Sequence, residues 1–306
     1  MANMAPPLPP LDVTRGPEGG EVGPVQSGWR LAVREFARNK LAVVGLAILA
    51  FFVIFSFAGP AFYHGDLLNA NLVAVNLPPG PGHPLGTDNL GFDVLAELMK
   101  GGQASLEVGF FAAAIGIMIG ALWGAVSGLI GGFFDSTMMR IVDVLLSIPF
   151  LFIVLIVSVR YGASVLSLSL IIGGFTWLVP ARLVRGEVLT LRVRDFVSAA
   201  RAAGSGRWRL ISRHLIPNAL SVIIVNVTFN VADAILAVAT LGFLGFGLHY
   251  PTFDWGDLLS NGIGYLQSGF WWQIYPAGAC IILVVMACNL IGDALRDSLD
   301  VRLRKR

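Results

Sequence analysis

Hydrophobic side chains are gathered into six long runs separated by more polar segments. The runs lie near residues 41–60, 106–130, 141–160, 164–182, 217–248 and 273–293. Each run is close to or longer than the roughly 20 apolar residues that a helix needs to cross a bilayer core of about 30 Å. The short alternating segments of a transmembrane β-barrel are absent from the sequence. The pattern therefore predicts an all-α, polytopic membrane protein with six transmembrane helices.

Prolines and glycines interrupt these runs at regular places. Pro149, Pro180 and Pro276 are expected to kink the third, fourth and sixth helices, because a proline removes a backbone hydrogen bond. Glycine recurs at every fourth position of the second run, at Gly116, Gly120, Gly124, Gly128 and Gly132. Such a stripe lets another helix approach closely. We favour packing inside this chain over a seam against a sister subunit.

The basic residues lie on one side of the predicted membrane. Of the 21 Lys and Arg residues, 19 lie before the first run, after the last, or after the second and fourth runs, and only Lys100 and Arg160 fall in the other loops. Positive charge accumulates in cytoplasmic loops, so both termini are expected in the cytoplasm. Residues 1–28 are expected to form a flexible tail there, and residues 298–306 a basic tail.

The composition agrees with a membrane protein and argues against other classes. Hydrophobic residues make up 56% of the chain and charged residues 13%, against about 45–50% and about 25% in soluble domains. A net charge of only +2 gives no basis for binding nucleic acid. This composition predicts a protein that lies in a lipid bilayer.

The segment between the fourth and fifth runs is the most distinctive polar part of the chain. Eight arginines fall between residues 182 and 213. Two short helices, near 195–203 and 207–215, are expected on either side of Gly204-Ser205-Gly206, where glycine permits a sharp reversal. The alanines before this turn favour a helix that another surface can approach closely. On physical grounds the segment fits docking to a partner protein and contact with anionic lipid equally well.

Polar residues inside the fifth run share one helix face. Asn226, Asn230 and Asp233 follow one another at helical spacing, which places them on the same side of the helix. An ionisable group at membrane depth costs about 2.5–3.5 kcal/mol on insertion scales, so it should avoid lipid. This face either lines a translocation path or takes part in a buried hydrogen bond between helices.

No recognisable catalytic motif occurs in the sequence. It lacks both the phosphate-binding loop Gly-x-x-x-x-Gly-Lys-Ser/Thr and the nucleophile elbow Gly-x-Ser-x-Gly, and its 4 histidines are scattered. The chain is therefore not expected to be an enzyme or to bind a metal or cofactor. If transport is driven by ATP, another chain must carry the nucleotide site.

Several segments carry a family pattern in the same order. Ala199-Ala200-x-x-x-Gly204 is followed by His214-Leu215-Ile216-Pro217. The other segments are Phe36–Gly45, His83–Gly91, Phe243–Gly247 and Pro251–Gly256. Together they resemble the permeases of binding-protein-dependent ABC importers, in the dipeptide/oligopeptide/nickel subgroup and its C-type subunit. The resemblance spans about residues 29–303. Ser198 and Phe92 depart from it, where the family usually has a glutamate and an arginine.

The resemblance implies a fold and a domain organisation. The fold is that of a type I ABC importer permease with a cytoplasmic coupling helix. Residues 29–60 would form an amphipathic segment and the first transmembrane helix, and residues 61–105 an extracytoplasmic loop. Residues 106–297 would form the permease transmembrane domain, with the coupling loop at 183–216.

The resemblance also implies partners and a location. A second permease would complete a heterodimer in a bacterial plasma membrane, and an extracytoplasmic binding protein would deliver the substrate. Two ATP-binding cassette domains would bind ATP and Mg and grip the coupling loops. The residues expected to transmit their motion are Ala199, Ala200, Gly204, Leu215 and Pro217, and those expected along the path are Asn226, Asn230 and Asp233.

Two other functions and several cargoes stay open. A stand-alone secondary transporter or channel could use Asp233 as a proton or ion site, but such proteins often contain inverted repeats, and we find no internal repeat. A membrane-embedded enzyme would need a catalytic constellation. Peptide is the default cargo of the subgroup, while no residue separates it from nickel, glutathione or glycopeptide.

Overall fold

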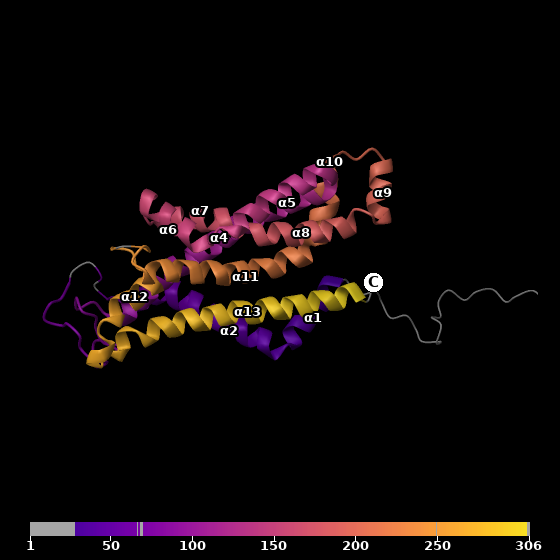
Figure 1. The fold of residues 1–306 in the computed structure, drawn as a ribbon. Coiled ribbons are helices and arrows are strands. Elements are labelled where there is room, and N and C mark those ends of the chain that lie inside the picture. Colours follow the sequence, from indigo (N-terminus) through magenta and orange to yellow (C-terminus); the bar gives the residue numbers. More distant parts are fainter. Residues whose placement is uncertain (1–27, 66, 68–69, 249, 305–306) are drawn as a thin grey trace, which may run out of the picture.

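The structure is a computed structural model that describes residues 28–65, 67, 70–248 and 250–304. Within these residues the chain is a helical bundle without strands. Its helices run along one long axis, with α12 at one end and α9 and α10 at the other, as Figure 1 shows. The elements are α1 (Gly28–Arg38), α2 (Lys40–Phe57), α3 (Gly59–Phe62), α4 (Val94–Ile130), α5 (Gly132–Ser147), α6 (Phe150–Tyr161), α7 (Val165–Thr176), α8 (Leu178–Leu191), α9 (Asp195–Ala202), α10 (Arg207–Leu210), a π-helical turn (Ile211–Leu215), α11 (Ile216–Phe243), α12 (Trp255–Ile263), two 3-10 turns (Leu266–Ser268 and Trp271–Gln273) and α13 (Tyr275–Arg304).

The helices long enough to span a membrane agree with the predicted number. Four are unbroken, at Lys40–Phe57, Val94–Ile130, Arg207–Phe243 and Trp271–Leu299. Two more spans are bent pairs: α5 and α6 meet at 79°, and α7 and α8 at 43°. Counting each pair as one span gives six in the part of the chain that the structure describes. The all-α, polytopic prediction is confirmed.

Two of the three predicted proline kinks are confirmed. Pro149 stands between α5 and α6, at the sharper bend. Pro180 has no N–H to donate to the carbonyl of Thr176, and α7 ends at Thr176. The prediction for Pro276 was wrong, because this residue is the second of α13, where a missing N–H costs little.

Three predicted boundaries fall inside helices of the structure. The loop predicted at 61–105 ends at Asp93, whose Oδ1 caps α4 by accepting a hydrogen bond from the N–H of Ala96 (3.0 Å). Twelve further residues are therefore helical, ahead of the domain start predicted at 106. Polar and glycine residues lower the hydropathy of this stretch, so the apolar pattern did not predict the helix. Burial of Leu98 and contact of Gly102 with Trp255 stabilise it.

The other two predicted boundaries also fall inside helices. Residues 183–191 of the predicted loop 183–216 continue α8, so the connection from α8 to α11 comprises residues 192–215. The domain end predicted at 297, after which a basic tail would follow, lies within α13, which continues to Arg304. Of the predicted N-terminal tail, residues 1–27 lie outside the described residues.

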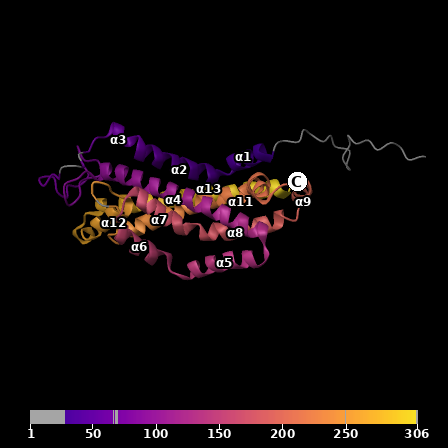
Figure 2. The same cartoon turned by 90° about the horizontal axis from the view of Figure 1, so that it is seen from above.

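Helix α4 is the central element of the bundle. It packs against α2, α7, α8 and α11, and Figure 2 shows it between α2 and α8. One cluster of buried side chains joins α2, α4, α12 and α13 around Trp255. A second joins α4, α8, α9 and the start of α11. Both clusters connect elements far apart in sequence through α4.

The glycine stripe packs within this chain, as predicted. A Cβ atom at Gly116 would meet Thr176 of α7, and one at Gly120 would meet the carbonyl oxygen of Trp177 at 2.8 Å. At Gly124 it would meet the carbonyl oxygen of Ala181 and the backbone nitrogen of Arg185 (2.8 Å). Gly128 continues this seam against α8, whereas Gly132 faces open space. The stripe therefore brings the backbones of α4 and α8 into direct contact.

Gly124→Ala should destabilise the protein by about 1–3 kcal/mol, because the new methyl group meets backbone atoms that cannot move aside. Thermal unfolding in detergent measures this as a lower Tm. Gly186→Ala is the matched control: this glycine lies within α8 in open space, and the change should stabilise by about 0.4–1 kcal/mol. Equal effects of the two changes would contradict close contact along the stripe.

Candidate functional site

The connection from α8 to α11 is built around a glycine turn. Helix α9 ends in a Schellman motif, in which the N–H of Ser205 donates to the carbonyl of Ala200 (3.0 Å) and the N–H of Gly204 to that of Arg201 (3.0 Å). Gly204 has a φ of 79°, and nothing lies within 4 Å of the place where a Cβ would stand. The requirement for glycine is therefore conformational and not a matter of space.

Buried side chains hold this connection to the bundle. Val197 of α9 and Leu215 of the π-helical turn have no exposed surface. Both belong to the cluster that contains Leu129 of α4 and Val188 of α8. Because packed interiors transmit strain with little compression, α9 cannot shift independently of these helices.

The π-helical turn joins the connection to α11 without a break. The N–H of Ile216 donates to the carbonyl of Ile211, five residues back. Pro217 follows as the second residue of α11, and its ring nitrogen has no N–H to donate to the preceding turn. Residues Arg207–Phe243 consequently form one apolar helical span.

The structure places the five predicted coupling residues in two groups. Ala199, Ala200 and Gly204 lie on α9 and its turn, with Ala199 and Gly204 exposed and Ala200 partly buried. Leu215 and Pro217 lie at the junction with α11, where Leu215 is buried and Pro217 exposed. The first group forms a surface, and the second connects that surface to α11.

Three exposed apolar side chains beside this surface were missed. Val193 is 72% exposed, Phe196 41% and Trp208 66%. Exposed apolar side chains within a polar, arginine-rich segment suit contact with another protein. Aromatic residues inside an arginine-rich segment were the sequence signal that could have found them.

Arginines of α8 bind carboxylates of α5. Nε and Nη2 of Arg185 donate to the two carboxylate oxygens of Asp135, each at 2.6 Å. Ser127 donates to the same carboxylate, and Nη1 of Arg192 donates to the carbonyl of Gly128 (2.9 Å). In the sequence, these arginines are recognisable only as markers of orientation. The structure adds that they join α5 and the end of α4 to α8.

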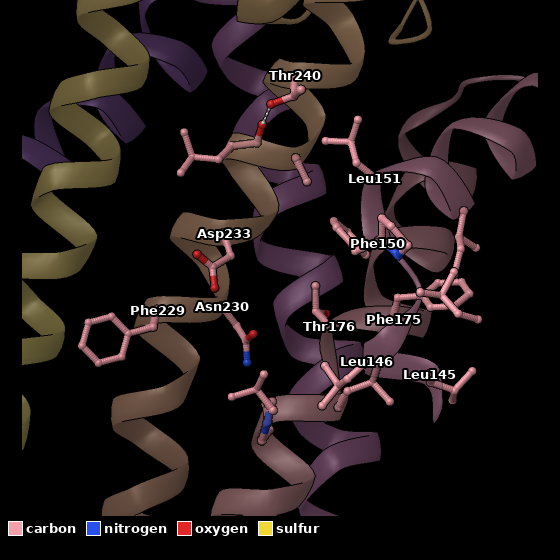
Figure 3. Close-up of a pocket in the computed structure, with 18 of the residues that line it drawn as sticks. Leu145, Leu146, Phe150, Leu151, Phe175, Thr176, Phe229, Asn230, Asp233 and Thr240 are labelled. Carbon is pink, nitrogen blue, oxygen red and sulfur yellow. Dashed lines mark hydrogen bonds between the residues drawn. The ribbon is translucent and has the colours of Figure 1, made fainter. Parts of the chain in front are cut away.

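The other predicted site opens beside α11. A cavity of about 690 Å³ lies between α11 and the bends of the α5–α6 and α7–α8 pairs. Asn226, Asn230 and Asp233 all line it, so the structure brings these predicted residues together. Figure 3 shows Asn230 and Asp233 on the α11 side, with Phe150 and Phe175 opposite.

These three polar side chains differ in their partners. Nδ2 of Asn226 donates to the carbonyl of Val222 in its own helix (2.8 Å). Asn230 is only 7% exposed, and Asp233 is exposed toward the cavity. Among the described residues, neither Asn230 nor Asp233 has a side-chain hydrogen bond to another helix. The predicted alternative, a buried hydrogen bond from these side chains to another helix, is therefore not seen in the part of the chain that the structure describes.

The two departures from the family pattern have different surroundings. Phe92 is buried, with its ring 6.3 Å from that of Tyr250 and 6.4 Å from that of Phe253. This aromatic cluster suits an apolar residue where the family usually has an arginine. Ser198, in contrast, is exposed on α9.

A buried carboxylate shapes the turn between α11 and α12. Asp254 accepts hydrogen bonds from the N–H groups of Leu248 (3.0 Å), Gly256 (2.8 Å) and Asp257 (3.0 Å). Burial raises the pKa of Asp254 to about 6 and outweighs these bonds, which act in the opposite direction. The carboxylate caps α12 and holds the end of α11 against it.

Two family descriptions match the chain. Residues 116–305 match the binding-protein-dependent transport system inner membrane component, and residues 27–79 match the N-terminal TM domain of oligopeptide transport permease C.

Full-length relatives agree with these matches. The dipeptide transport system permease protein of Bacillus subtilis is 37% identical over 280 residues, covering 92% of this chain and 86% of the relative. The oligopeptide transport system permease protein of the same organism is 36% identical over 277 residues, covering 90% of each chain. That of Mycobacterium tuberculosis is 40% identical over 274 residues, covering 88% of this chain and 93% of the relative.

A double-mutant cycle tests the contact between α5 and α8. Asp135→Asn and Arg185→Gln should each lower stability by about 1–3 kcal/mol, because each leaves a partly buried charge without its partner. The double variant should lose no more than the worse single variant, since the two changes remove one interaction. The Tm in detergent measures all three.

Arg182→Gln is the matched control for this cycle. Arg182 pairs with Asp143, but both side chains are nearly half exposed, at 47% and 45%. Removing such a pair should change stability by less than about 1 kcal/mol. Fully additive losses in the Asp135 and Arg185 variants would show that the two side chains do not stabilise each other.

Proposed function

Because the chain belongs to the family of inner membrane components of binding-protein-dependent transport systems, we propose that its residues 192–215 couple a partner ATPase to the cavity beside α11. The chain is a permease subunit of an ABC importer, and ATP hydrolysis lies in the partner ATPase. A stand-alone secondary transporter or channel is not favoured by this membership.

The continuous helical span from Arg207 to Phe243 is the observation that carries the proposal. One end of this span lies beside Gly204 and Trp208, and its middle carries Asn230 and Asp233. A displacement of the α9 surface would therefore be transmitted to the cavity along one continuous helix. The burial of Val197 and Leu215 supports this, because α4 and α8 would move with the same surface.

The five coupling residues take distinct roles in this proposal. Ala199 and Ala200 provide a surface that the ATPase approaches closely, and Gly204 supplies the turn. Leu215 anchors the connection in the core, and Pro217 joins it to α11. Val193, Phe196 and Trp208 add apolar contact area at the edge of that surface.

The family implies, in general terms, a second permease, ATPases and a binding protein. We propose specifically that a different permease completes a heterodimer and that two ATP-binding cassette domains bind ATP and Mg. A binding protein outside the membrane would deliver cargo to the α12 end. Asn226, Asn230 and Asp233 would line one half of the path.

We propose that the cargo is a peptide. The support is that the relatives are dipeptide and oligopeptide transport system permease proteins. An extracytoplasmic binding protein would set the finer choice among peptides.

Gly204→Val should strongly reduce the stimulation of ATP hydrolysis by loaded binding protein in the assembled importer. A β-branched residue at positive φ is strained by about 1–2 kcal/mol, so the turn after α9 would change shape. Gly204→Asn should stay near normal, because asparagine tolerates this conformation. The measurement is ATPase activity with and without binding protein in proteoliposomes.

Gly206→Ala is the matched control for this change. Gly206 has a φ of −69° and open space around it, so alanine fits without strain. Normal stimulation in Gly204→Val, with the complex assembled, would refute the coupling role of this turn.

Cysteine labelling tests the proposed orientation. Ser198→Cys on α9 should react with a membrane-impermeant maleimide only after the cells are permeabilised, and Val73→Cys, at a site 95% exposed, should react in intact cells. The native Cys280 and Cys288 are buried and should give little background. The reverse pattern would place α9 outside the cell and contradict the proposed role.

A further inference from the structure

The cavity beside α11 is lined by one ionisable side chain among the described residues. That side chain is Asp233, and the other polar groups of the lining are Asn226, Asn230, Thr176 and Thr240. The remaining walls are apolar, with phenylalanine, leucine, isoleucine, valine, alanine and proline side chains. The cavity therefore offers one acidic side chain in otherwise neutral and mostly apolar surroundings.

The carboxylate of Asp233 is available to a ligand. It faces the cavity and has no hydrogen bond or ion pair with another described residue. One turn away, Asn230 is only 7% exposed. Its side-chain amide likewise has no hydrogen-bond partner among the described residues. Both side chains can therefore exchange hydrogen bonds with a ligand that enters the cavity.

The chemistry of that partner follows from the charge. An apolar wall lowers the local dielectric constant and strengthens the interaction of a carboxylate with any charge nearby. A protonated amine or a guanidinium beside Asp233 gains a charge-assisted hydrogen bond. A carboxylate in the same place is repelled and leaves Asp233 unpaired.

We propose that Asp233 makes this cavity a recognition site for positively charged groups of the cargo, so that cationic peptides pass faster than anionic ones. This inference rests on the proposed peptide transport. Asn230 assists by exchanging hydrogen bonds with the amide groups of the peptide. The permease then adds its own selection by charge to the selection that a binding protein makes.

The test is uptake of three tripeptides by the complete importer in proteoliposomes. Ala-Lys-Ala, Ala-Gln-Ala and Ala-Glu-Ala differ only in the central residue, whose side chain is cationic, neutral or anionic. Each is supplied on saturated binding protein, so that delivery is equal. The unmodified importer should take up the lysine peptide about tenfold faster than the glutamate peptide, the size expected from one charge-assisted hydrogen bond.

Asp233→Asn should bring that ratio close to one. Asp293→Asn is the matched control: it removes an exposed carboxylate from α13 that does not line the cavity, and the ratio should persist. Asn226→Asp combined with Asp233→Asn returns a carboxylate to the same face of α11. This double variant should recover part of the preference.

The outcomes separate the inference from the function on which it rests. An unchanged ratio in Asp233→Asn, or equal slowing of all three peptides, would overturn the charge recognition alone. If the unmodified importer shows no ATP-dependent uptake of any of the three, the peptide cargo itself is overturned and the inference with it.

Discussion

The direct contact of α4 with α8 along the glycine stripe is the constraint on which the rest of the structure depends. Because Gly120 and Gly124 lack side chains, the backbone of α8 lies against α4. This position brings Arg185 to Asp135 and Arg192 to the end of α4. The same contact fixes the core in which α9 is anchored. A wider separation would remove the ion pair and loosen the support of the α9 surface together.

The two bent pairs explain where the cavity lies. Pro149 and Pro180 interrupt α5–α6 and α7–α8, and both prolines line the cavity. Irregular backbone at membrane depth is tolerated where it is buried in protein or lines a water-filled cavity. The bends therefore hollow the bundle beside α11, and both prolines face the space that they create.

The α9 surface and the cavity are parts of one mechanical unit in our proposal. Gly204 shapes the surface, and α11 extends from the adjacent turn to the cavity without a break. The arginines near this surface have a second use as well. Some contact carboxylates of α5, so the positive charge that orients a membrane protein also ties its helices together.

The sequence by itself determined the helical class, the number of spans and the turn at Gly204, because hydropathy, proline and glycine act over a few neighbouring residues. It also placed Asn226, Asn230 and Asp233 on one helix face. Only the tertiary structure decided that α4 begins at Val94, that Pro276 lies in the first turn of α13, and that Arg185 binds Asp135, 50 residues away. Those features depend on contacts between distant segments, which local patterns do not encode. The cavity has the same origin, since three separate helical elements must meet before Asp233 faces anything.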